Sequence, residues 1–588
     1  MRTIGGTKAL MAGMLCLAAG CNVSLADIPA ALDRVPTGTP VTIAIRDLEA
    51  FKARVMGMAE QLKLPMPGDA KEKLDGVLKM EGLNRKGSLA LAITPPKEDG
   101  MGEGTVVMIV PVTDAAAVIK SLGGEGGGKV VKVKMPDGDK DGYAKDIGGG
   151  YLAISDSQEV AEKFTGAAGA KGSHEKALGA AGKRIADAAE VLIIADIPAM
   201  HDQLAKGVAE MKEQIEGMAA MMGEQGAQMQ SGLKIMTAVA DAFVRDAQAG
   251  VVGLSMDEKG VNLDFGANFK GESASAKVLT GEGHSSRLLA RLPAGSFLFA
   301  AAMDWSSPGM RTLIRNAGEM SKAAGAQASP MGGFDQWARM MEFADGQAYF
   351  MGASDLGAGL LANSSYYFPS KDAKKLGESY KAMMMEMNGK KQQGITFKVD
   401  YKDNAKEIAG AKASSYTLAF EMDPNDPAAA QAQMMMPMLF GPEGSMSGFV
   451  LPFDGGLVGT MSQNSELLTK ALEAARSGKG MMDDALVKQT AERLPGDRCM
   501  ELFVGTKAIL DTVQGFMAMM GGGGDMQTPE QLAPIGIGMS TLGGGAQARV
   551  HVPLDVIKTF VEMGKQMEPK DGDMQGDDDM KGDAKPKF

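Results

Sequence analysis

The alternation of apolar and polar residues predicts a recurring unit in which a strand leads into a helix. The apolar run Val41–Ile45 is followed by Asp47, and an apolar pattern of helical period starts at Leu48. Asp at this point is expected to cap the helix by accepting hydrogen bonds from its first N–H groups. The same arrangement recurs at 191–196, 297–304 and 500–506, with Thr506 in place of Asp in the last.

Two further patterns each occur twice, in the same order along the chain. A glycine turn followed by a strand occurs at 149–155 and 455–461, and two strands joined by a turn occur at 253–265 and 538–550. We therefore expect two related halves, residues 27–283 and 284–566. The predicted fold class is α+β, and each half is expected to hold a largely antiparallel sheet with helices packed on one face.

The first half contains a stretch that has no counterpart of equal length in the second. Apolar residues recur there at helical spacing, and a second stripe follows in 233–244. This pattern predicts an αα-hairpin inserted in the first half, which either packs on its own sheet or serves as a partner-binding arm. The first stripe consists of Leu204, Val208, Met211, Ile215, Met218 and Met222.

The two ends of the chain differ in composition from the rest. Residues 1–26 have Arg2 and Lys8 before an uncharged apolar stretch that is too short to span a bilayer, which is typical of a secretory signal peptide. Cleavage after Ala26 would release the protein, whereas lipoprotein processing at Cys21 would attach it to a membrane. Residues 567–588 are rich in Asp, Gly and Lys, so a disordered acidic tail is expected.

Charge and cysteine content narrow the class of protein. The net charge is −12, and it becomes −14 without residues 1–26, which carry two positive charges and no negative one. An acidic chain repels phosphate backbones, so no nucleic-acid partner is expected. Of the three cysteines, only Cys499 lies far from the signal segment, where it is expected to be a buried apolar residue.

No motif predicts a catalytic, cofactor-binding or metal-binding residue. Asp137–Gly142 resembles the start of a calcium loop, but Gly148 stands where a bidentate Glu is needed, so a polar hairpin loop is expected. The four histidines are far apart and have no metal-ligand spacing. A catalytic triad dispersed along the chain would leave no sequence signal, so a hydrolase stays open as an alternative.

Methionine is unusually abundant, with 48 residues, and it forms clusters at 383–387, 434–438 and 517–520. Thioether sulfur binds Cu(I) and is reversibly oxidised, so a role in handling Cu(I) or oxidants is one interpretation. The alternatives are a flexible core filler in place of Leu and aromatic residues, or an apolar binding surface.

The segment Gly149–Asp156, the hairpin at 253–265 and the strand units that follow the signal segment resemble uncharacterised exported bacterial proteins. These belong to a domain-of-unknown-function family common in planctomycete-type bacteria. The resemblance implies export, but no activity or site.

The function expected from the sequence is that of a non-catalytic binding or scaffolding protein of the cell envelope, periplasmic or extracellular. Its partner is expected to be another envelope or extracellular protein, and contact with a membrane is expected only if Cys21 is lipidated.

Overall fold

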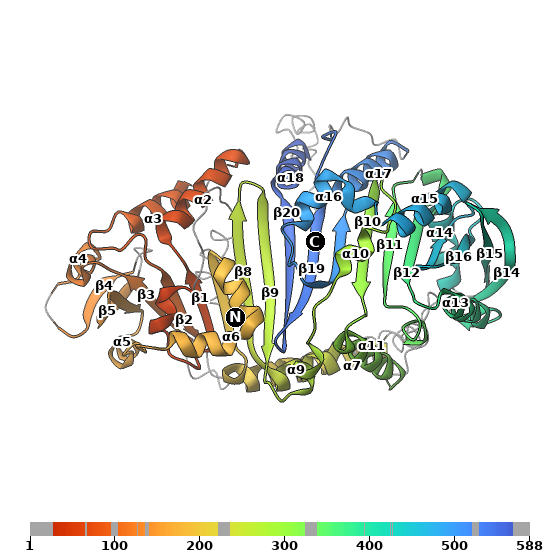
Figure 1. Cartoon of the computed structure of the whole chain (residues 1–588). Helices are drawn as coiled ribbons and strands as arrows, with labels where there is room; N and C mark the ends of the chain where they lie inside the picture. The colour runs from red at the N-terminus through yellow and green to blue at the C-terminus, as the bar shows by residue number, and fades with distance from the viewer. Residues whose placement is uncertain are drawn as a thin grey trace, which may run out of the picture.

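The computed structural model describes residues 28–64, 68–95, 104–125, 128–135, 140–221, 236–323, 338–354, 356–392, 394–423, 425, 427–519 and 528–567. These residues form one 20-stranded sheet with helices around it (Figure 1). Every pair of neighbouring strands is antiparallel, which confirms the predicted α+β class.

The sheet runs from β4 at one edge to β13 at the other. In the first part of the sheet the order across it is β4 (Val131–Lys134), β5 (Asp141–Gly148), β6 (Tyr151–Ser155), β3 (Thr105–Pro111), β2 (Leu89–Thr94), β1 (Val41–Ile45), β7 (Val191–Asp196), β8 (Ala247–Asp257) and β9 (Gly260–Phe269). The order continues with β20 (Gly545–Pro553), β19 (Ile535–Leu542), β18 (Arg498–Val504), β10 (Phe297–Asp304), β11 (Gly346–Gly352), β12 (Ser364–Pro369), β17 (Gly456–Thr460), β16 (Met446–Phe453), β15 (Ala411–Met422), β14 (Ile395–Ile408) and β13 (Lys391–Gln392).

Helices cover both faces of this sheet, so the expectation of helices on one face is wrong. On β17, Leu457 belongs to the buried cluster around α13, while the adjacent Val458 belongs to the cluster around α15. All five residues of β17 are buried, as expected for a continuous apolar run that needs a layer on each side. We call the two sides the α2 face and the α6 face, after a helix that packs on each.

The α2 face carries helices from both parts of the chain, together with two of the four buried clusters. These helices are α2 (Leu48–Gln61), α3 (Gly68–Leu78), α4 (Ala115–Ser121), α11 (Pro308–Ala323), α13 (Ala373–Met387), α17 (Thr506–Met519) and α18 (Leu554–Met567). The α6 face carries η1 (Ala30–Arg34), α5 (Gln158–Lys163), α6 (Lys171–Ala188), α10 (Ser285–Leu289), α15 (Ser465–Ser477), η4 (Met481–Asp483) and α16 (Ala485–Ala491). The remaining elements are η2 (Pro198–Met200), α7 (His201–Met221), α9 (Ala274–Val278), η3 (Leu356–Ala358) and α14 (Pro427–Phe440).

The predicted caps hold in only part of the repeated units. Asp47 accepts a hydrogen bond from Ala50 N and caps α2, as expected. Asp304 instead accepts from Ser306 N and His284 N, and the cap next to α11 is Ser307. Thr506 donates its hydroxyl to Ala533 O, so it ties α17 to a distant loop. The shared strand ends are therefore used differently in the two parts of the chain.

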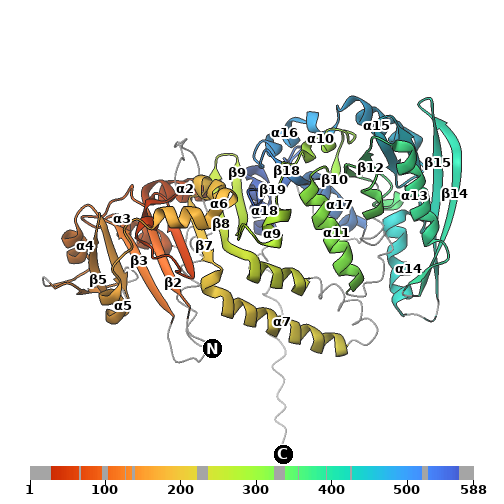
Figure 2. The same cartoon turned by 60° about the horizontal axis from the view of Figure 1, so that its bottom comes forward.

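The segment predicted as an αα-hairpin contains α7 and a helix at 236–246, and 222–235 lie outside the described residues. In the second helix, Phe243 packs edge-on against Phe269 of β9, with the ring centroids 6.0 Å apart. In α7, by contrast, no side chain whose burial is described is buried, and Met221 is 89% exposed. Figure 2 shows α7 lying apart from the strands, so the expected packing on the sheet is not found for this helix.

Candidate functional site

Several residues of interest from the sequence lie outside the described residues: Cys21, Ala26, and 136–139 of the calcium-like loop. The loop's described Asp141 forms ion pairs with Lys132 and Lys134, each at 2.6 Å, which lower the pKa of its carboxyl to about 2. The loop joins β4 to β5, and these two strands pair antiparallel, as a polar hairpin loop requires.

The histidines do not come together. His174 is buried with its Nε2 2.9 Å from Val35 O, and His551 is buried with its Nδ1 2.8 Å from Asn262 Oδ1. Burial, aided by the charge of Arg493, lowers the pKa of His551 to about 4. Among the described residues no group of three or more His, Cys, Asp or Glu side chains could hold a metal ion.

Cys499 is buried in β18 at 3% exposure, as the sequence predicted. Burial raises the pKa of its thiol to about 11, so almost none is ionised near neutral pH. Because the thiolate is the reactive form, this side chain acts as an apolar filler.

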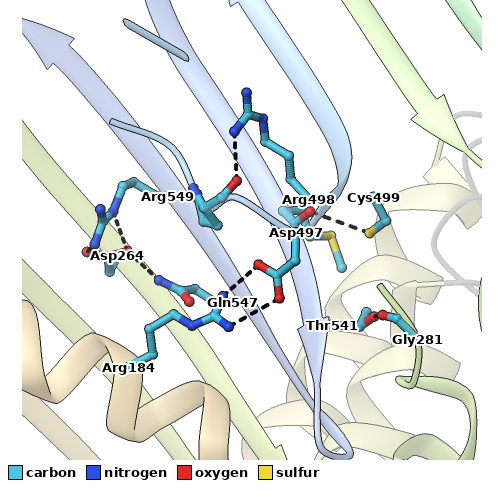
Figure 3. Close-up of polar contacts among 11 residues, drawn as sticks. Arg184, Asp264, Gly281, Asp497, Arg498, Cys499, Thr541, Gln547 and Arg549 are labelled. Carbon is cyan, nitrogen blue, oxygen red and sulfur yellow. Dashed lines mark hydrogen bonds and ion pairs between the residues drawn. The ribbon is translucent and has the colours of Figure 1, made fainter. Parts of the chain in front are cut away.

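A network of ion pairs crosses the α6 face where β9 meets β20 (Figure 3). Asp264 is 1% exposed, and it accepts hydrogen bonds from Arg549 at 2.8 and 2.9 Å and from Gln547 at 2.9 Å. Arg184 of α6 pairs with Asp497 at 2.7 and 3.1 Å. These charged groups bind each other, and none of them is among the residues that line the two cavities described next. Their role in the structure is to join the two parts of the sheet.

Two adjoining cavities lie on the α2 face over β10, β11 and β18. The first, which we call the methionine cavity, has a volume of about 290 Å³. The second, which we call the α17 cavity, is a hollow that is largely open to solvent and has a volume of about 540 Å³. The methionine cavity is lined by Ala301, Ala302, Met303, Met340, Gln347, Ala348, Tyr349, Tyr366, Phe368, Tyr380, Met383, Met384, Met387, Tyr416, Leu418, Met446, Met461 and Met500. The α17 cavity is lined by Leu298, Phe299, Met351, Leu360, Leu502, Val504, Ile509, Thr512 and Val513.

The period of the strands places the two cavities side by side. Alternate residues of β10 point to the same face, so Phe299 in the α17 cavity and Ala301 in the methionine cavity are consecutive positions on that face. Across the sheet, Phe299 pairs with Met351 and Ala301 pairs with Tyr349. Adjacent rows of one sheet face therefore line the two cavities.

The methionine cavity is closed on its far side by α13 and by three buried tyrosines. The hydroxyl of Tyr366 donates to the Tyr380 hydroxyl at 2.7 Å, and that of Tyr416 donates to Thr460 O at 2.9 Å. Burial raises the pKa of Tyr380 to about 12, so its phenol stays neutral. No charged side chain lines either cavity. The site can therefore bind an uncharged apolar group and exclude an ion that keeps its hydration shell.

The sequence signals that build this site are ordinary ones. The apolar run in 297–304 predicts a strand, which is correct, and the methionine cluster at 383–387 lies on α13. No sequence signal identifies the stretch of sheet that the helices leave uncovered.

Comparison of this chain with protein-family models, with curated proteins and with solved structures finds no match in any of the three. Of the helices in the described part of the chain, none combines the length and the apolar character needed to cross a bilayer.

Proposed function

We propose that this protein is an exported, non-catalytic binding protein of the cell envelope whose ligand is apolar and occupies the two cavities on the α2 face. The observation that carries the proposal is a pair of adjoining cavities, of about 290 and 540 Å³, with no charged side chain in either lining. Sites for small molecules are typically about 300–1,000 Å³ and mostly apolar, with a few polar groups that orient the ligand.

The ligand class follows from the lining. The polar side chains in the two linings are those of Gln347, Thr512 and four tyrosines, and the rest of the lining is aliphatic, aromatic or thioether. Each methylene group buried contributes about 0.8 kcal/mol, so a single acyl chain or a compact apolar molecule would bind mainly through its hydrocarbon. Neither lining contains a Ser, His, Cys, Asp or Glu, so neither cavity supplies a nucleophile and base for the hydrolase alternative.

We also infer that residues 27–283 and 284–566 are related halves, with the helical hairpin inserted in the first. The support is strand order. Taken from the outside inward, the first part runs β4-β5-β6-β3-β2-β1-β7-β8-β9. The second part has two additional strands at its edge, β13 and β14, and then runs β15-β16-β17-β12-β11-β10-β18-β19-β20. Each strand of one series holds the place of its counterpart in the other.

Binding is tested with N-phenyl-1-naphthylamine, an uncharged apolar fluorophore, titrated into the full chain. We expect a saturable increase in fluorescence. The affinity for the fluorophore should fall at least about tenfold in Ala301→Phe, because the new ring fills the methionine cavity. The matched control is Ala267→Phe, which places the same ring at another half-buried strand position outside both linings. Absence of saturable binding by the unmodified chain, or equal loss in both variants, would refute the proposal.

A second candidate, the binding of Cu(I), is favoured by one observation. Eight methionines line the methionine cavity, namely Met303, Met340, Met383, Met384, Met387, Met446, Met461 and Met500. Thioethers suit Cu(I), so several could share one ion. Titration of Cu(I) against a competing chelator should then show binding tighter than micromolar that is lost in Met303→Leu/Met500→Leu and kept in Met434→Leu. Binding no tighter than micromolar would end this candidate.

A further inference from the structure

A second apolar feature lies on the surface of α14 and α17 and extends beyond the α17 cavity. On α14, Met434, Met435 and Met438 are 77%, 45% and 41% exposed. On α17, Ile509, Val513 and Phe516 are 36%, 44% and 43% exposed, at the spacing of one helix face. We call these six residues the α14–α17 surface. Exposed apolar residues on neighbouring helices are typical of an interaction site.

The two helices are neighbours, and the surface reaches the α17 cavity. Both α14 and α17 contact η3, and Leu360 N donates to Met438 O at 3.0 Å. Leu360 also lines the α17 cavity, as do Ile509 and Val513. Two residues of the exposed surface are therefore also part of the cavity wall, so the cavity and the surface are continuous.

The surface carries almost no charge. The sequence of α14, Pro427–Phe440, contains no ionisable side chain. On α17, Lys507 and Asp511 pair with each other at 2.6 Å. A protein partner of ordinary kind would find few fixed polar groups with which to form the hydrogen bonds of an interface rim. A fluid layer of acyl chains needs none, and methionine side chains adapt to it.

We propose that the α14–α17 surface docks on a lipid bilayer, so that an acyl chain can pass from the bilayer into the α17 cavity. This inference rests on the proposed function, because it names lipid as the source of the apolar ligand. It requires no lipidation at Cys21, since the contact is made by the folded part of the chain. Because the contact is apolar, salt should not weaken binding. Because the chain has a net charge of −12, anionic lipid should not be needed for binding.

The test is flotation of the full chain with vesicles of phosphatidylcholine alone and with vesicles that also contain phosphatidylglycerol. We expect binding to the phosphatidylcholine vesicles that high salt does not weaken. Met434→Lys/Val513→Lys should reduce the bound fraction at least about tenfold, because two charges would enter the apolar layer. The control is Met385→Lys, a change at 43% exposure on α13, outside the surface. The melting temperature and circular dichroism of each variant show whether it is folded.

The outcomes separate this inference from the proposed function. Saturable fluorophore binding without vesicle binding overturns the inference and leaves the function standing. Vesicle binding without fluorophore binding supports docking by the α14–α17 surface and refutes the passage of an acyl chain into the α17 cavity. Binding that needs phosphatidylglycerol and vanishes in salt overturns it, since charge would then be the cause. A change of oligomeric state in Met434→Lys/Val513→Lys, seen by light scattering and without vesicle binding, overturns it in favour of a second copy of this chain.

Discussion

The helix that follows β1 and the helix that follows β10 lie on the same face of the sheet but pack very differently. In α2, Leu48, Phe51, Val55 and Met58 are all buried against the strands. In the described part of α11, Met310 is the one large apolar residue that is buried, and Leu313 is 40% exposed. The first helix fills its region of the face, and the second leaves room for the methionine cavity.

The contacts of α11 explain its position. It packs on α9, and Arg311 donates to Asp345 at 2.8 Å and to Ala344 O at 3.2 Å. Polar contacts near its N-terminal end thus help to hold this helix, in whose described side chains Met310 is the one large apolar residue that is buried. On β10, Ala301 and Met303 face the methionine cavity. On β1, by contrast, Ile43 and Ile45 pack against α2. A cavity is therefore found where small or flexible strand residues lie under a helix that buries few apolar side chains against them.

The largest effect is expected from Phe51→Ala. Phe51 is 6% exposed under α2, so its removal should lower the free energy of unfolding by about 3–5 kcal/mol. Met303→Ala, in the half-buried cavity wall, should cost about 1 kcal/mol or less. Urea unfolding of both variants checks this. Equal losses would show that the face over β10 is as tightly packed as the face over β1.

Acid should weaken the junction between the two regions, where His551 of β20 meets Asn262 of β9. The pKa of His551 lies near 4 in the folded chain, against 6.5 for the free side chain. Between these values the unfolded chain binds a proton that the folded chain does not. The contribution of His551 to the free energy of unfolding is therefore fully present above pH 6.5. It falls by about 3 kcal/mol as the pH is lowered toward 4. Unfolding curves against pH should lose this slope in His551→Gln and keep it in His201→Gln.

Cys499 reports on opening of the region around the methionine cavity, since it belongs to the same buried cluster. The rise of its pKa from 9.0 to about 11 lowers the thiolate fraction roughly a hundredfold. Labelling with an aromatic disulfide, in a chain with Cys16 and Cys21 replaced by Ser, should be slower by at least this factor in the folded than in the unfolded state. Fast labelling of the folded chain would mean that the region opens freely.

The smallest effect is expected from adding methylene groups. Ala59→Leu, at 5% exposure on α2, should cost about 1–3 kcal/mol because the space is already full. Ala301→Leu should be near neutral, because the side chain extends into the methionine cavity. Thermal unfolding compares the two variants. A cost for Ala301→Leu as large as for Ala59→Leu would contradict the presence of free space there.

Local features of the fold were predictable because they depend on neighbouring residues. The strand at Val41–Ile45, the Asp47 cap and the hairpins of β8–β9 and β19–β20 all follow from period and turn residues. Burial of Cys499 follows from its apolar surroundings. The position of the site was not predictable, because it depends on how α11 packs, and that is set by contacts such as Arg311 with Asp345.

The junction of the sheet shows a second limit of sequence reasoning. Asp264 alternates with Leu263 and Phe265, which indicates a strand whose polar side faces water. In the structure Asp264 is buried, because Arg549, a residue 285 positions away, neutralises it. On the other side of the same strand Phe265 is 44% exposed. Pairing between β9 and β20 reverses the expected roles of the two sides, and no local pattern encodes that pairing.

The place of β20 in the sheet has a consequence for the growing chain. β9 ends at Phe269, and its partner β20 begins at Gly545, so synthesis of the long stretch between them precedes their pairing. Throughout that time the N–H and C=O groups along one side of β9 form an open edge that can pair with another chain. A nascent chain stalled before the last hairpin is therefore the aggregation-prone form of this protein. Once β19 and β20 have been synthesised, β20 pairs with β9 and closes that edge, and β19 pairs with β18 of the second part of the sheet.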